Sequence, residues 1–190
     1  MINIQANRTS SQTSFNRLNH GNFHPISSLS DTALSNLENN YIKRRVTTGG
    51  IYPLSNVRAE KLRRISNGLS GEELCQLILD LSQVNADGFT TYLDLYRAIF
   101  PAKAWCGHTS IRTIMRVLHE AIIYCVENSL PLVTALVVPS DTRQLSPEAL
   151  QNIYDCAGDM GVDVGPNVDE FVTNQILNAF NLFDTERTLH

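Results

Sequence analysis

The first thirty residues of the chain contain no aspartate or glutamate, and Asp31 is the first acidic residue. This segment holds six Ser, five Asn, two Thr and two Gln, and its only Lys or Arg residues are Arg8 and Arg17. Low hydrophobicity combined with a Ser/Asn-rich composition is typical of disordered chain. We therefore expect residues 1–30 to form an unfolded leader, either a plain flexible terminus or an export signal.

The chain also lacks long hydrophobic runs and paired cysteines. Its longest mostly apolar stretch, Leu130 to Pro139, is about half the length needed to cross a bilayer. The N-terminus has no apolar core of the kind found in secretory signal peptides. Four cysteines are widely separated, with no C-x-x-C pair, which favours a reducing compartment over a disulfide framework.

Charge is unevenly distributed in the remaining sequence. Residues 43–64 carry seven Lys/Arg against Glu60 alone, whereas residues 139–190 carry nine Asp/Glu against Arg143 and Arg187. Two interpretations are open: separate solvated faces, or a basic segment lying on the acidic end of this chain or of a second copy. The formal net charge of −4 disfavours bulk nucleic-acid binding, which depends on many cations neutralising phosphates.

Hydrophobic periodicity and capping residues predict a mainly α (α+β) fold: a small helical domain with a short β element. We expect a basic helical arm over residues 31–68 and a globular helical domain over residues 69–190. Caps at Ser30, Ser70 and Ser146 mark three helix starts, and the box Ser70-x-x-Glu73 is the clearest of them. The apolar run at residues 132–138 predicts a buried strand. This order of elements also fits a winged helix.

Residues 91–161 resemble a widespread, poorly characterised bacterial domain. The shared pattern is a Thr-Tyr-x-x-Leu opening at Thr91, a long helix from Ile111, a Leu-Pro-x-x-x-Ala-Leu-Val-Val strand at Leu130, and a short helix ending at Gly161. The family's Pro-Gly-x-Gly-Phe turn is replaced by Leu145-Ser-Pro-Glu. The resemblance implies a fold and a bacterial origin, but no reaction.

Two further resemblances are present, one in the part of the chain that starts at Thr91 and one in the leader. Residues from Thr91 onward are similar to the winged-helix domain of alkylguanine alkyltransferases, but Thr134-Ala-Leu-Val stands where their Pro-Cys-His-Arg nucleophile motif belongs, which excludes alkyl acceptance. The leader resembles those of type III secretion effectors and also has the acid-poor composition of mitochondrial transit peptides. The resemblance to type III effectors would place the protein in a host cell. The alternative location is the bacterial cytoplasm.

The tetrapeptide Trp105-Cys-Gly-His resembles the active-site motif of disulfide isomerases, but Thr109 replaces the second cysteine, so dithiol exchange is excluded. A cysteine hydrolase would need Cys106 or Cys156 beside a histidine base such as His108 or His119. We leave open an enzyme of unrecognised type that uses Cys106 or His119.

Metal and cofactor signals are weak. Cys106, His108, His119 and Cys125 supply zinc-type ligands at a spacing that fits no zinc finger. Asp159, Asp163, Asn167 and Glu170 fall in an EF-hand frame, but Val164 occupies the position that needs glycine. We predict no metal and no cofactor.

Arg112, Arg116 and His119 recur at helical spacing on one predicted face, with Trp105 just before the helix. Trp and Arg are enriched in interface hot spots, so we predict that Trp105, Arg112, Arg116 and His119 bind a partner. The leading hypothesis is a secreted, effector-like protein that binds a host protein, or itself, without catalysis. The alternative is a winged-helix-like nucleic-acid-binding protein, since such proteins place base-reading groups on an equivalent helix face.

Overall fold

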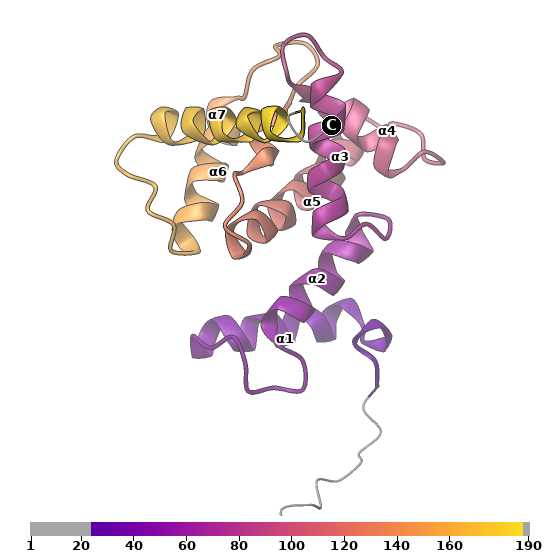
Figure 1. Ribbon diagram of the computed structural model, residues 1–190. Helices are drawn as coiled ribbons and strands as arrows, with labels where there is room; N and C mark the ends of the chain where they lie inside the picture. Colours follow the sequence, from indigo (N-terminus) through magenta and orange to yellow (C-terminus); the bar gives the residue numbers. More distant parts are fainter. Residues whose placement is uncertain (1–23, 188–190) are drawn as a thin grey trace, which may run out of the picture.

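A computed structural model describes residues 24–187 of the chain, and this part is mainly helical (Figure 1). Its seven α-helices and two short strands confirm the predicted fold class. The helices are α1 (Asp31–Arg44), α2 (Leu54–Ile65), α3 (Gly71–Gln83), α4 (Tyr92–Ile99), α5 (His108–Glu127), α6 (Pro147–Asp159) and α7 (Val168–Arg187). Two 3-10 helices, η1 (Ile26–Ser28) and η2 (Val133–Leu136), and the strands β1 (Thr90–Thr91) and β2 (Val137–Val138) complete the elements.

Local capping chemistry sets three of the helix starts. Ser30 accepts a hydrogen bond from the Ala33 amide at the start of α1, and Ser146 does the same for Ala149 at the start of α6. Ser70 and Glu73 form both halves of a capping box at α3. These starts lie where the sequence predicts them. Helix α5 differs, because Gly107 is its N-cap and the Ser110 hydroxyl instead accepts a hydrogen bond from the Cys106 amide.

The β element is smaller than expected and parallel. Thr90 pairs with Val137 and Thr91 with Val138. The prediction of a strand over residues 132–138 is wrong for most of its length, because Val133–Leu136 coil into η2 and only Val137–Val138 extend. A wing is an antiparallel hairpin, so this parallel pair does not supply one.

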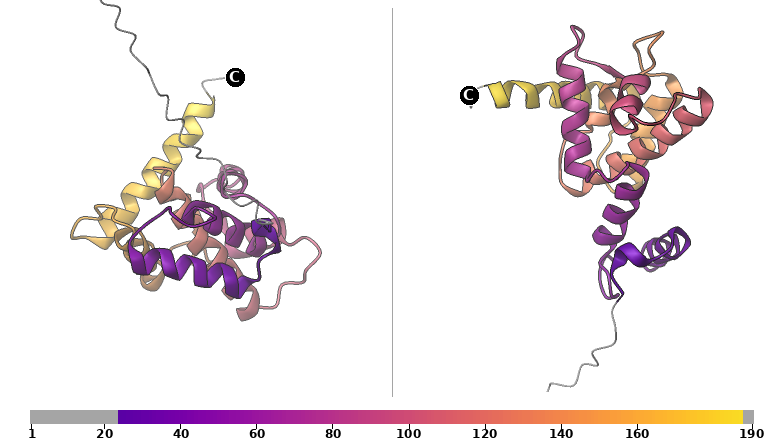
Figure 2. Two further views of the ribbon diagram at one scale, coloured as in Figure 1. Left: turned by 90° about the horizontal axis from the view of Figure 1, so that it is seen from below. Right: turned by 90° about the vertical axis from the view of Figure 1, so that its right-hand side faces the viewer.

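Helix α5 runs through the middle of the body and contacts α3, α4, α6 and η2 (Figures 1 and 2). Its inner face buries Ile114, Val117 and Ala121 fully. Cys75 of α3 and Cys125 of α5 meet in this core, with 3.6 Å between their sulfur atoms. Both thiols are free and behave as small hydrophobic groups.

The arm has a small core of its own beneath the body in Figure 1. Leu34, Tyr41, Leu54 and Val57 form it, and Ile26 and Leu29 pack against it. Ile26 and Leu29, which fall within the predicted leader, thus pack on the fold, and residues 1–23 of that leader lie outside the described residues. Helix α2 leads from this small core into α3, and its Leu62 already belongs to the core of the body.

Candidate partner-binding groove

A groove of about 570 Å³ lies where the arm meets the body. Its walls come from the first turns of α1, the last turns of α2 and the outer face of α5. Three of the four residues predicted to bind a partner, Arg112, Arg116 and His119, line it. The other lining residues are Asp31, Ser35, Lys61, Arg64, Ile65, Met115 and Glu120. The groove thus has an apolar patch from Ile65 and Met115 and an otherwise polar, mostly charged lining.

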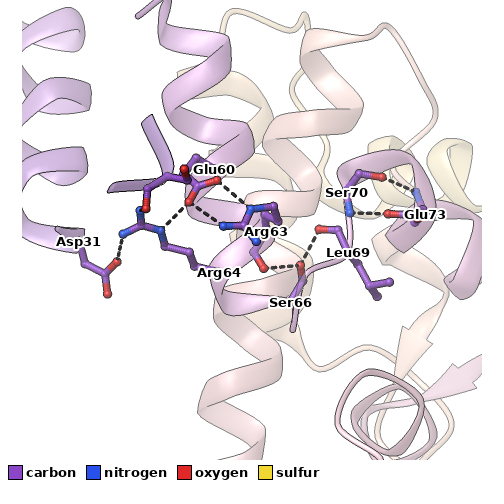
Figure 3. Close-up of polar contacts among 9 residues, drawn as sticks. Asp31, Glu60, Arg63, Arg64, Ser66, Leu69, Ser70 and Glu73 are labelled. Atoms are coloured by element: carbon purple, nitrogen blue, oxygen red, sulfur yellow. Dashed lines mark hydrogen bonds and ion pairs between the residues drawn. The ribbon is translucent and has the colours of Figure 1, made fainter. Parts of the chain in front are cut away.

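The cations that α2 contributes are neutralised inside the fold. Lys61 forms ion pairs with Glu38 and, at 3.0 Å, with Glu120. Arg64 bonds Glu60 at 2.8 Å and Asp31 at 2.7 Å, as the close-up in Figure 3 shows. Hydrogen bonds between such charged groups are stronger than those between neutral groups.

Within one chain, this pairing differs from both interpretations of the uneven charge. The basic segment lies neither on the acidic end of its own chain nor wholly in solvent. Its α2 cations bond carboxylates from the arm and from α5, among them Glu38, Glu60, Glu120 and Glu127. Among the described residues of 139–182, Asp and Glu side chains make no ion pair with residues 43–64.

Two buried carboxylates of this network, Glu60 and Glu38, have a pKa below the ordinary value. Hydrogen bonds from Arg63, and further from Arg64, outweigh burial and lower the pKa of Glu60 to about 2. Burial acts to raise the pKa of Glu38, but the hydrogen bonds and charges of Lys61 and Arg58 outweigh it, so the pKa lies below its usual value. Glu60 and Glu38 are therefore charged near neutral pH, and their ion pairs hold α2 against its neighbours.

Arg112 and Arg116 stand apart from this network. Both side chains are exposed, and neither has an ion-pair partner within residues 24–182. The sequence allows an Arg116–Glu120 pair one turn apart, but Glu120 is only 9 % exposed and bonds Lys61 instead. One oxygen of Glu120 has no hydrogen-bond partner among the described residues. The groove therefore presents two uncompensated guanidinium groups, which suit planar carboxylate or phosphate ligands.

His119 links the groove to α6. Its Nδ1 lies 3.7 Å from the Cys156 sulfur, so a thiol and an imidazole do meet, though through Cys156 and not Cys106. Burial raises the pKa of the Cys156 thiol, and the negative charges of Asp159 and Glu120 add to this. A nucleophilic cysteine needs the opposite, because the thiolate is the reactive form. His119 is exposed, and no side chain among the described residues is hydrogen-bonded to its other nitrogen.

Trp105 does not line the groove. Its ring packs edge-on against Tyr96, with 5.3 Å between centroids, and the side chain is half-buried at the edge of the body's core. Cys106 is exposed and its thiol donates to the Ala104 carbonyl at 3.6 Å. The structure therefore separates Trp105 and Cys106 from the three groove residues of α5.

The metal candidates are not assembled. Cys125 is fully buried beside Cys75, whereas Cys106 is exposed, so the zinc set does not converge. Asn167 caps α7 by accepting from the Glu170 amide at 3.2 Å, a structural use for one of the calcium candidates. Within residues 24–182, no cluster of three or more His, Cys, Asp or Glu side chains is placed to hold a metal ion.

Comparison with known proteins gave no relative. No family model, no curated protein and no solved structure matched the chain. Over residues 24–187, no helix combines the length and apolarity that a bilayer crossing requires.

Sequence reasoning missed the contribution of α2 to the groove. Lys61 and Arg64 line it from another helix, and the Lys61 bond to Glu120 of α5 joins residues far apart in the sequence. The available signal was their spacing of three residues, which places them on one side of a basic helix.

Proposed function

We propose that this chain is a binding protein without catalytic activity and that its groove takes an acidic segment of a protein partner. One observation carries the proposal: Arg112 and Arg116 are uncompensated, whereas Lys61 and Arg64 beside them are neutralised by Glu38, Glu120, Glu60 and Asp31. An uncompensated pair of guanidinium groups one helical turn apart suits two carboxylates of an acidic peptide. The small apolar patch of Ile65 and Met115 adds room for a flanking aliphatic side chain.

The chemistry of the groove favours binding over catalysis. His119 of the groove contacts Cys156 of α6, and burial raises the pKa of that thiol. Binding at the groove needs no activated nucleophile. In the wider proposal, the acid-poor leader delivers the protein from a bacterium into a host cell, where the acidic partner lies.

The binding test uses a fluorescein-labelled glutamate-rich peptide and a glutamine-rich peptide of equal length, with fluorescence anisotropy as the readout. Arg112→Glu/Arg116→Glu is expected to weaken binding of the glutamate-rich peptide by about tenfold or more, since it turns attraction into repulsion. The matched control is Arg97→Glu/Lys103→Glu, which makes the same charge change at exposed cations outside the groove. The control is expected to bind like the unmodified protein.

Three outcomes contradict the proposal. The unmodified protein does not distinguish the two peptides, or the control loses as much affinity as the groove variant, or a short DNA duplex binds tighter than the peptide and is lost in the groove variant. The last outcome favours the nucleic-acid alternative. Delivery is tested separately by deleting residues 1–23, because Ile26, Leu29 and Ser30 belong to the folded arm. Unchanged export of that deletion contradicts the effector proposal.

A further inference from the structure

The C-terminal end of α1 and the loop after it carry apolar and basic side chains together, in the lowest described part of the fold in Figure 1. Ile42, Val46 and Ile51 are 54 %, 44 % and 67 % exposed, among the most exposed large hydrophobic residues described. Lys43, Arg44 and Arg45 lie between the first two of them and are also exposed. We refer to these six residues as the basic–apolar tip.

The loop after α1 folds back on the helix and keeps the six tip residues at one end of the arm. The Val46 amide bonds the Tyr41 carbonyl at 3.2 Å, and the Leu54 amide bonds the Thr47 carbonyl at 2.9 Å. The Tyr41 hydroxyl donates to the Tyr52 carbonyl. Gly50 touches the same hydroxyl so closely that a Cβ would lie 2.3 Å from it. The Tyr41 side chain thus links the end of α1 to residues 50–52 of the loop, which keeps Ile42 and Ile51 at the same end of the arm.

The fold leaves the tip open and its charges free. Lys43, Arg44 and Arg45 have no ion-pair partner within residues 24–182, unlike Arg58, Lys61, Arg63 and Arg64 of the same basic segment. In the view from below, α1 and the loop after it lie in front of the rest of the described chain (Figure 2, left). The protein thus presents three uncompensated cations and three aliphatic side chains outward at one end.

We propose that the basic–apolar tip is a peripheral membrane contact that binds the surface of a bilayer rich in anionic lipid. Clustered cations are attracted to the negative surface potential of such a bilayer. Aliphatic side chains beside them then enter the boundary between headgroups and acyl chains, which strengthens the contact. A soft, flat surface can accommodate a protruding tip, whereas nucleic-acid phosphates would use the cations and leave the three aliphatic side chains in water. This surface is separate from the groove and does not depend on its function.

The test measures co-sedimentation of the full chain with vesicles. We expect binding to phosphatidylcholine vesicles that contain about 30 % phosphatidylserine and little binding to phosphatidylcholine alone. Lys43→Gln/Arg44→Gln/Arg45→Asn should weaken binding about tenfold or more; asparagine tolerates the left-handed backbone of Arg45 (φ 52°). Ile42→Ser/Val46→Ser/Ile51→Ser keeps every charge and should also lose binding, most clearly at about 0.5 M salt, where charge attraction is screened.

Two controls separate this site from the leader and from the groove. A chain that lacks residues 1–23, and the Arg112→Glu/Arg116→Glu variant, are both expected to bind the anionic vesicles like the full chain. Because the tip residues are exposed, the variants should keep the circular dichroism spectrum and thermal midpoint of the full chain.

Any of four results overturns the proposal: equal binding to both vesicle types, full binding after either set of tip substitutions, loss of binding with residues 1–23, or tighter binding of the tip to a DNA duplex than to anionic vesicles. A failed vesicle test leaves the peptide test of the groove unaffected, because the two assays use different variants and different ligands.

Discussion

Lys61 of α2 and Glu120 of α5 form an ion pair, with 3.0 Å between Nζ and Oε1, and this contact ties the arm to the body. The same ammonium group also bonds Glu38 of α1, so one cation joins three helices. Arg58 adds a parallel link, from Glu38 to Glu127 at the end of α5. These ion pairs of Lys61 and Arg58, which we call the charged seam, hold the arm to the body. They lie beside the small apolar core around Leu34 and Val57.

Replacing Lys61 should therefore cost much more than replacing a surface lysine. Lys61→Ala leaves Glu120 without its cation and removes one of the two from Glu38, although both carboxylates are less than 10 % exposed. A buried charge that has lost its ion-pair partner is strongly destabilising. We therefore expect the free energy of unfolding to fall by about 3 kcal/mol. Urea unfolding followed by circular dichroism measures this change.

Lys43→Ala is the matched control, since Lys43 is exposed and without an ion pair among residues 24–182. It should change the free energy of unfolding by less than about 0.5 kcal/mol. Lys61→Ala/Glu120→Gln should recover part of the loss, because glutamine leaves no charge behind. Equal values for Lys61→Ala and Lys43→Ala would show that the seam does not hold the arm.

Glu60 makes stability depend on acid pH. Its pKa is about 2 in the folded protein, against an ordinary value of 4.5, so the unfolded chain binds the proton more readily. This contribution to stability is complete above about pH 4.5 and is lost as the pH falls from there towards 2. We expect the free energy of unfolding to decline across this window.

Glu60→Gln removes that titration and should reduce the decline, while Glu38 and the other carboxyls with lowered pKa keep part of it. Arg63→Ala/Arg64→Ala should reduce it similarly, because it removes the hydrogen bonds that lower the pKa of Glu60. The measurement is a series of urea titrations between pH 2 and 7. A decline of unchanged size in both variants would refute the assignment.

Gly71 sits where α3 and α5 approach closely. A Cβ at this position would lie 2.2 Å from the Tyr124 ring, near the root of that side chain, so the ring or the helix must shift. Gly71→Ala should lower the free energy of unfolding by about 1–3 kcal/mol through overpacking. Gly158→Ala in α6 is the matched control, because its nearest neighbour is a Val164 methyl at 3.6 Å.

In the control, alanine should stabilise the helix by up to about 1 kcal/mol, since it restricts the unfolded chain more than glycine does. Differential scanning calorimetry of the two variants would show shifts of the thermal midpoint in opposite directions. Shifts of the same sign would mean that the Tyr124 ring moves aside without lowering the free energy of unfolding.

Features that depend on neighbouring residues were predictable from the sequence. Ser30, Ser70 and Ser146 cap helices where expected, because a cap needs only the backbone three residues ahead. The strand over residues 132–138 was not predictable in the same way. A buried apolar run satisfies strand and helix patterns alike, and β1 offers only two residues for pairing, so the remainder coils as η2.

In the candidate site, too, features set by nearby residues were predictable, whereas contacts between distant helices were not. Arg112, Arg116 and His119 share a face by helical spacing alone, and they do line the groove. The Lys61–Glu120 pair and the His119–Cys156 contact join residues 59 and 37 positions apart, so they depend on how the helices pack. Trp105 was grouped with the arginines because it precedes them in sequence, but its ring turns to Tyr96.

The four cysteines should differ widely in their reaction with iodoacetamide. Cys106 is exposed and should react first, and Cys156 should follow slowly, because burial and nearby carboxylates raise the pKa of its thiol. Cys75 and Cys125 are buried against each other, and their hydrogen bond together with burial raises the pKa of the Cys75 thiol. Since the thiolate is the attacking form and needs access to the reagent, this pair should stay unmodified until the protein unfolds.

Peptide mass spectrometry after timed labelling, with and without urea, gives the order of reaction. Cys106→Ser should remove the fastest site and leave the other three rates unchanged, because its thiol contacts only the Ala104 carbonyl and lies outside the core. In urea all four should react at similar rates. Labelling of Cys75 or Cys125 at the rate of Cys106 in the folded protein would mean that α3 and α5 separate readily, which contradicts a core in which the two sulfur atoms lie 3.6 Å apart.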